Sequence, residues 1–237
     1  MHRTLLPLIL IALLLPACGG GDNKQAEAQA ALEAARPEYE ARKANIESAL
    51  KQAAEWQAKD GVPALEWGDR PAPKFLDVRK NKFDKEANAR VFELKDGALN
   101  TDALSMLGLF ADREWPKRQE EQLDGKALTK GAAESALEKY KGVRYLCLLI
   151  TDDFKEAEFG SGTLFTIKFQ PGHWKGRALY FDLEENKLIG GKQIEATNSS
   201  KIDFKTKDLK PEEQQKAARQ AAEEDLRAQI LQAAQNP

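Results

Sequence analysis

The sequence predicts an α+β fold, in which a small, mostly antiparallel sheet packs with N-terminal and C-terminal helices. Two segments rich in helix-forming residues, 24–59 and the stretch that begins at Pro211, enclose the chain. Between them, residues 143–197 hold apolar and alternating segments of strand length separated by turn residues. An order of helix, short mixed elements, strands and helix is typical of the α+β class.

The N-terminal helix is predicted by its composition and by one apolar stripe. Pro37 is expected to break or kink it, because proline removes a hydrogen bond and clashes with the preceding turn. Before Pro37 the apolar residues are mostly alanine, which predicts a weakly packed stalk over 24–36. Residues 60–74 contain three prolines and are predicted to be a loop or linker. The apolar stripe beyond Pro37 consists of Tyr39, Ile46, Leu50, Ala53 and Trp56.

The middle of the chain predicts short elements. Residues 89–95 alternate between apolar and polar side chains, which favours a strand. Asn100, Thr101 and Asp102 can cap a short helix that extends to residue 111. A further helix is predicted over 129–140 from its apolar spacing.

The strongest strand signals lie within 143–197. The nearly continuous apolar run 143–151 is typical of a central strand, and 165–169 alternates like a half-buried one. Segments 177–183 and 187–196 flank a polar turn and predict a β-hairpin. The pair Gly190-Gly191 in the second arm indicates a bulge or a close backbone approach.

The C-terminal helix is predicted to begin at Pro211, with Glu212 and Glu213 near its positive end. A narrow apolar ridge follows at four-residue spacing. The ridge could pack on the sheet or against the N-terminal helix. Its members are Ala218, Ala222, Leu226 and Ile230.

Composition excludes several classes of protein. Lys and Arg total 36 and Asp and Glu 38, so no strongly basic face is available for nucleic acid. A hydrophobic fraction of 42% with 31% charged residues excludes a polytopic membrane protein. Two cysteines exclude a disulfide-dense scaffold, and two histidines disfavour a histidine-based metal site. We therefore expect no cofactor and no metal.

The first residues have the pattern of an export signal. His2 and Arg3 precede an apolar run from Leu5 to Leu15. As a helix this run would reach about 17 Å, which is too short for a hydrocarbon core of about 30 Å. The run therefore fits the apolar region of a signal peptide better than a permanent membrane span.

The next residues, Leu15-Pro16-Ala17-Cys18, resemble the lipobox of bacterial lipoproteins. The resemblance implies removal of residues 1–17 as a signal peptide. Cys18 would become the first mature residue and carry a diacylglycerol and an N-acyl chain such as palmitate. Two or more acyl chains anchor a protein stably to a membrane. The alternative is a conventional signal peptide cleaved after Ala17, with a free Cys18.

The lipoprotein reading also predicts the domain organisation and location. Residues 18–37 would form a lipidated tether and an Ala-rich stalk, and residues 38–237 a single α+β domain. Gly19 after the cysteine, rather than an aspartate, favours the outer membrane, with the domain facing the periplasm. Gly172, residues 178–183 and residues 187–191 resemble uncharacterised proteobacterial lipoproteins, a resemblance that specifies no activity.

Acidic side chains follow the strongest predicted strand, namely Asp152, Asp153, Glu156 and Glu158. Carboxylate oxygens at such a place could bind a hard cation such as Ca²⁺. The spacing does not match an EF-hand, and Lys155 partly neutralises the run. We expect a solvated loop and retain Asp152 and Asp153 as candidate ligand-site residues.

His173 and Trp174 lie in a loop predicted between two strands. A histidine beside an aromatic ring could bind a ligand or act as a general base. The spacing assigns neither a nucleophile nor an orienting acid. Other motifs have plain structural interpretations: a turn at Gly160-Ser161-Gly162-Thr163, a turn at Asn198-Ser199-Ser200 within a glycosylation pattern, and a buried Cys147.

These observations favour a membrane-anchored envelope lipoprotein that acts as a non-catalytic binding or interaction module for an envelope partner. The alternative is a hydrolase-like enzyme of the cell envelope with a site near Asp152 and His173. Self-assembly through the Ala-rich terminal helices ranks below both, because they lack sustained Leu or Ile at heptad positions. The oligomeric state stays open.

Overall fold

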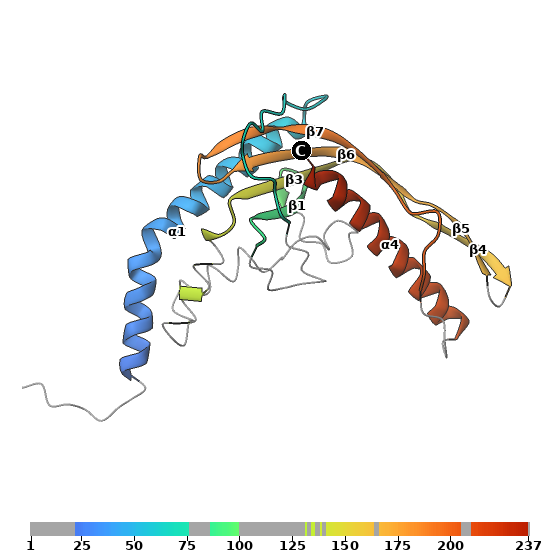
Figure 1. Cartoon of the computed structure of the whole chain (residues 1–237), viewed down its shortest axis with the longest axis horizontal. Coiled ribbons are helices and arrows are strands. Elements are labelled where there is room, and N and C mark those ends of the chain that lie inside the picture. Colours follow the sequence, from blue (N-terminus) through green and yellow to red (C-terminus); the bar gives the residue numbers. More distant parts are fainter. Residues whose placement is uncertain are drawn as a thin grey trace, which may run out of the picture.

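The computed structural model describes residues 22–75, 86–99, 131, 134–135, 138, 141–163, 166–204 and 210–236. Helices α1 (Asp22–Gln57) and α4 (Pro211–Gln235) pack on opposite faces of a five-stranded sheet, which confirms the α+β class (Figure 1). Cys18, the helix expected over 101–111 and most of that expected over 129–140 lie outside the described residues. The strands are β1 (Ala89–Lys95), β2 (Ala98–Leu99), β3 (Tyr145–Lys155), β4 (Glu158–Thr163), β5 (Thr166–Gln170), β6 (His173–Asp182) and β7 (Lys187–Thr197).

The sheet is mixed but mostly antiparallel, with the order β2-β1-β3-β6-β7. Only β1 and β3 pair in parallel among the described strands. Strands β3 and β6 form a long hairpin, which β4 and β5 continue as a separate two-stranded arm. Because β7 ends at Thr197, this arm extends beyond the main sheet (Figure 1).

Alternate side chains of β3 divide between two apolar cores. Leu146, Leu148 and Ile150 share one core with residues of α1. Tyr145, Cys147 and Leu149 share the other with residues of α4. The ridge of α4 therefore packs on the sheet, which settles the alternative that the sequence leaves open. Its buried members are Ala218, Ala222, Leu226 and Ile230.

Helix α1 runs through Pro37 without a break, so of the two outcomes expected at this proline the break is wrong. The ribbon instead bends along its length (Figure 1), as helices that contain proline commonly do. The segment before Pro37 is also packed, because Ala28 and Leu32 are 1% and 3% exposed. Leu32 belongs to the core on the α1 face, so the expected stalk is packed at least in part.

Residues 62–75, which we call the strap, follow α1 and close one edge of the sheet. The backbone N–H of Gly191 donates to the carbonyl of Pro63 (3.0 Å), and that of Glu66 donates to Ile189 (2.9 Å). A Cβ atom on Gly190, whose φ is +135°, would collide with the carbonyl oxygen of Ala64. The close backbone approach expected at Gly190-Gly191 is confirmed, and a register shift marks the bulge.

The strap then covers part of the α4 face. The Trp67 ring lies 5.1 Å from the Tyr145 ring and 5.5 Å from the Tyr180 ring, centroid to centroid. Leu65 and Phe75 pack against the same core. The loop expected over 60–74 is thus a packed part of the domain.

Candidate functional site

The four candidate residues of the sequence lie on two adjacent strands. Asp152 and Asp153 belong to β3, and His173 and Trp174 begin β6. The loops expected at both places are therefore wrong: β3 continues past its apolar run because β6 pairs with it as far as Lys155. The turn expected at Gly160–Thr163 is also wrong, because these residues lie in β4 and pair with β5.

A β-bulge in β3 places the two neighbouring carboxylates on the same face of the sheet. Thr151 pairs with Gly176 and Asp153 pairs with Lys175, so Asp152 is the extra residue. Asp152 contacts Arg177 and Asp153 contacts His173. Both carboxylates lie on the face that carries α1, although neighbours in a regular strand point to opposite faces.

Asp152 takes part in a structural clamp at the end of α1. The guanidinium Nε of Arg177 lies 3.0 Å from each oxygen of Asp152, and its Nη2 lies 2.8 Å from Oδ1. The Nη1 of Arg177 donates to the carbonyls of Trp56 (2.9 Å) and Lys59 (2.6 Å), and to Gly61 (3.3 Å). Because Arg177 engages both carboxylate oxygens of Asp152, this side chain is poorly placed to bind a ligand.

His173 and Asp153 form a pair at the surface. The imidazole Nε2 lies 2.9 Å from Oδ2 of Asp153, and this hydrogen bond lowers the pKa of the carboxyl. The pair lines a shallow hollow that also contains Lys175, Glu195 and Thr197. Among the described residues, no hydroxyl donates to the imidazole. The arrangement is that of a base oriented by an acid, without an assigned nucleophile.

Trp174 belongs to the core, with 1% of its surface exposed. Its indole Nε1 donates to the hydroxyl of Thr151 (3.0 Å), which donates in turn to Glu93 (2.9 Å). This hydrogen bond gives the indole nitrogen a partner inside the core, as a buried tryptophan usually requires. Cys147 is also buried, as expected, and burial raises the pKa of its thiol.

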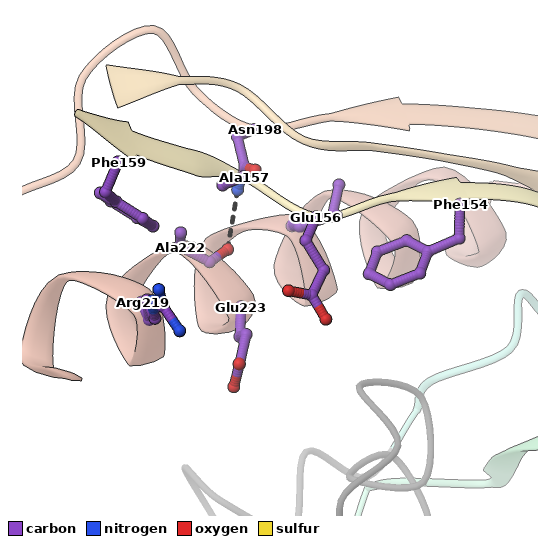
Figure 2. A pocket seen from close by; sticks show the side chains of 9 residues that line it. Phe154, Glu156, Ala157, Phe159, Asn198, Arg219, Ala222 and Glu223 are labelled. Atoms are coloured by element: carbon purple, nitrogen blue, oxygen red, sulfur yellow. Dashed lines mark hydrogen bonds between the residues drawn. The ribbon is translucent and has the colours of Figure 1, made fainter. Parts of the chain in front are cut away.

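The structure brings together a second set of residues that local sequence patterns do not reveal. A groove with a cavity of about 220 Å³ lies between the β3–β4 segment and α4. Phe154 points into this groove (Figure 2). It is 38% exposed, and among the described residues it is the only large apolar side chain that is exposed. Further lining residues are Glu156, Ala157, Phe159, Asn198, Arg219, Ala222, Glu223 and Leu226.

The groove owes its shape to Asn198, which holds α4 beside the hairpin. The side chain of Asn198 accepts from the backbone N–H of Gly172 (3.0 Å) and donates to the carbonyl of Ala222 (2.7 Å). The carboxylate of Asp225 accepts hydrogen bonds from Ser199 and Asn198. Burial alone would raise the pKa of Asp225, but these hydrogen bonds outweigh burial, so its pKa is lowered. Asn198 is 6% exposed, so its amide joins α4 to the hairpin inside the domain.

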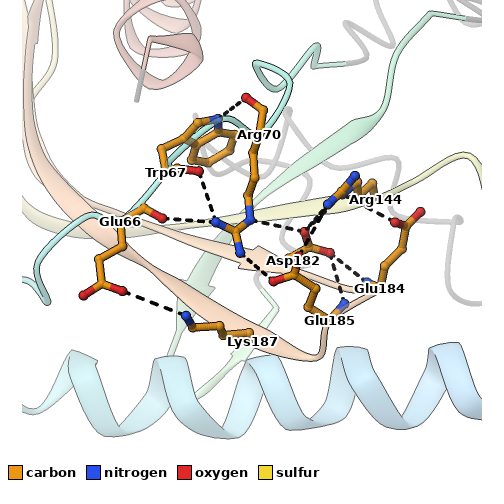
Figure 3. Close-up of polar contacts among 8 residues, drawn as sticks. All are labelled: Glu66, Trp67, Arg70, Arg144, Asp182, Glu184, Glu185 and Lys187. Atoms are coloured by element: carbon orange, nitrogen blue, oxygen red, sulfur yellow. Dashed lines mark hydrogen bonds and ion pairs between the residues drawn. The ribbon is translucent and has the colours of Figure 1, made fainter.

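An ion cluster around the buried Asp182 fastens the strap to the turn between β6 and β7 (Figure 3). Asp182 is fully buried and accepts from the Nε (3.0 Å) and Nη2 (2.9 Å) of Arg144. It also accepts from the backbone N–H groups of Glu184 and Glu185, and Arg70 of the strap lies 3.6 Å away. The guanidinium groups of Arg70 and Arg144 are both paired with carboxylates of this turn, so the cluster is structural.

In the described parts of the chain, no group of three or more His, Cys, Asp or Glu side chains is arranged to hold a metal ion. None of the helices within those parts is long and apolar enough to cross a bilayer. No protein-family model, curated protein or solved structure matches the chain.

Proposed function

We propose that the mature chain is a lipid-anchored lipoprotein of a bacterial envelope, and that it acts as a non-catalytic binding module. The anchor would be Cys18, in the outer membrane, with the domain in the periplasm. The observation that carries the binding role is the groove, where Phe154 is exposed to water beside α4. A hollow that combines aromatic side chains with a few polar groups is a common form of binding site.

The position of the groove supports a partner away from the anchoring membrane. Helix α1 begins at Asp22, so the chain from Cys18 to the helix spans at most about 15 Å. The start of α1 and the β4–β5 arm lie at opposite ends of the long axis of the molecule (Figure 1). An anchor at Cys18 would therefore present the groove towards the periplasm.

Two measurements in cells test this proposal. The wild-type chain should fractionate with membranes, and Cys18→Ser should be released in soluble form. A photo-crosslinking residue in place of Phe154 should capture a partner, whereas the same residue in place of Glu195, exposed on the opposite face, should not. A wild-type protein that is soluble without detergent would refute the anchor, and equal capture at both positions would refute the site.

The second candidate function is a hydrolase-like envelope enzyme, which the contact between His173 and Asp153 favours. A panel of chromogenic esters and amides would be offered to the wild type and to His173→Ala and Asp153→Ala. Loss of hydrolysis in both variants is expected if the imidazole is a base oriented by the carboxylate. Equal rates in all three proteins would exclude this pair as the site.

A further inference from the structure

We infer that the groove binds an extended segment of a partner protein, which adds a strand to the outer edge of β4. The segment would insert an apolar side chain beside Phe154 and hold a basic side chain near Glu156. This inference rests on the proposed binding function and specifies its ligand as a linear peptide. Strand addition to an exposed sheet edge is a recurrent mode of peptide recognition.

The first observation is the open edge of the hairpin. Strand β4 pairs with β5 on one side, and no other described strand pairs with its second edge. On the same side of β3, the ladder with β1 ends at the pair Glu93 and Leu149. The edge from Ile150 to Thr163 is therefore open within the described chain. Its backbone N–H and C=O groups are available to a further strand.

The second observation is the cavity directly beneath that edge. Phe154 and Phe159 project from the hairpin towards α4, where Ala222 lies on the opposite wall (Figure 2). Leu226 of α4 also lines the cavity. A volume of about 220 Å³ is below the usual range for small-molecule pockets. It suits one large apolar side chain, which would remove the exposed Phe154 ring from water.

The third observation is charge on the rim. Glu156 and Arg219 are exposed, and neither makes a hydrogen bond or an ion pair with another described residue. Glu156 lies between Phe154 and Phe159, and Arg219 lies at the Phe159 end (Figure 2). A basic side chain next to the apolar anchor would meet Glu156. A lipid acyl chain would instead face charges of both signs, so a polypeptide is the favoured ligand.

The test uses a phage-displayed library of random 12-residue linear peptides as its probe. The target is the mature chain produced with Cys18→Ser, and affinities of selected peptides are measured by fluorescence anisotropy. We expect a consensus that places a large apolar residue beside Lys or Arg. Phe154→Ala and Glu156→Arg should each weaken binding about tenfold. The matched control, Glu195→Arg on the opposite face, should change affinity less than about twofold.

Backbone methylation tests the strand geometry directly. Methylating every second amide of a selected peptide removes the donors that face β4, whereas methylating the other set removes donors that face solvent. One set should abolish binding and the other should leave it within a few-fold. Equal tolerance of both sets would overturn strand addition.

Other outcomes also overturn the inference. They are a library that yields no binder, binders insensitive to Phe154→Ala, self-association of the chain that depends on Phe154, or binding to anionic vesicles through the same residue. Each is distinguishable from failure of the proposed function. Specific crosslinking at Phe154 in cells, with no peptide selected, would leave a binding module whose partner is not a linear segment. Both exposed substitutions should preserve the fold, which circular dichroism checks.

Discussion

Arg177 should contribute more to stability than any other charged residue at the end of α1. Its side chain is 8% exposed and binds Asp152 together with the carbonyls of Trp56 and Lys59. The last carbonyls of a helix lack partners within the helix, and a cation there also favours the helix dipole. Arg177→Met retains an unbranched apolar stem but removes the charge and every donor.

The magnitude follows from what the substitution leaves behind. Breaking a buried ion pair costs about 3–5 kcal/mol, and a hydrogen bond to a charged group contributes about 1.5–3 kcal/mol. Asp152 is 37% exposed, so water can solvate part of its charge in the variant. We therefore expect a loss of about 3 kcal/mol in the free energy of unfolding.

Urea unfolding followed by circular dichroism measures the loss, and hydrogen exchange in the last turn of α1 should accelerate. Lys175→Met is the matched control, because Lys175 lies on the same strand and face but is exposed. It should cost less than about 0.5 kcal/mol. If Arg177→Met costs no more than this control, apolar packing of Ala53 and Trp56 alone holds the end of the helix.

Three further predictions follow from local geometry. Gly190→Ala should destabilise the domain by about 2–4 kcal/mol in urea unfolding, because the new Cβ collides with the strap at a φ of +135°; an unchanged midpoint would contradict the packing of the strap. The lowered pKa of Asp225 means that its stabilising effect is present above about pH 4 and is lost as pH falls through the folded value. Asp225→Asn should therefore flatten the acid side of the stability profile between pH 6 and 3, and parallel profiles would argue against it. His173→Ala should let the pKa of Asp153 rise towards its ordinary value in a carboxyl NMR titration, whereas an unchanged titration would show that the pair does not form in solution.

The sequence was sufficient to predict the elements whose local side-chain pattern or turn residues determine their conformation. Strand β1 occupies the predicted residues 89–95, and the turn 184–186 joins β6 and β7 as expected. The α4 ridge and the close approach at Gly190 were also predictable, since spacing and glycine reflect packing and backbone geometry directly. The polar end of β3 was not, because its strand conformation comes from pairing with β6 rather than from apolar side chains.

The candidate site was predictable only in part. The sequence indicates only that Asp153 and His173 belong to the same strand-rich part of the chain. Their hydrogen bond depends on the pairing of β3 with β6. The residues around Trp174 do not show whether its ring is buried or contacts a ligand, and the structure shows that it is buried. Phe154 is a single apolar residue within an acidic run, and its exposure depends on where α4 lies.

The bulge at Asp152 connects these differences. In a regular strand that places Leu146, Leu148 and Ile150 on the α1 face, Phe154 would lie on that face as well. The extra residue reverses the alternation, so Phe154 pairs opposite Trp174 and points towards α4.

The residue that the bulge inserts also reaches Arg177 and closes the clamp on α1. Gly176 faces the bulge, and a Cβ atom there would collide with the carbonyl oxygen of Ile150 and approach the Trp174 ring. The irregularity is thus set by backbone packing between two strands, which alternation along one of them cannot reveal. One inserted residue therefore accounts both for the use of Asp152 in the clamp and for the direction of Phe154 into the groove.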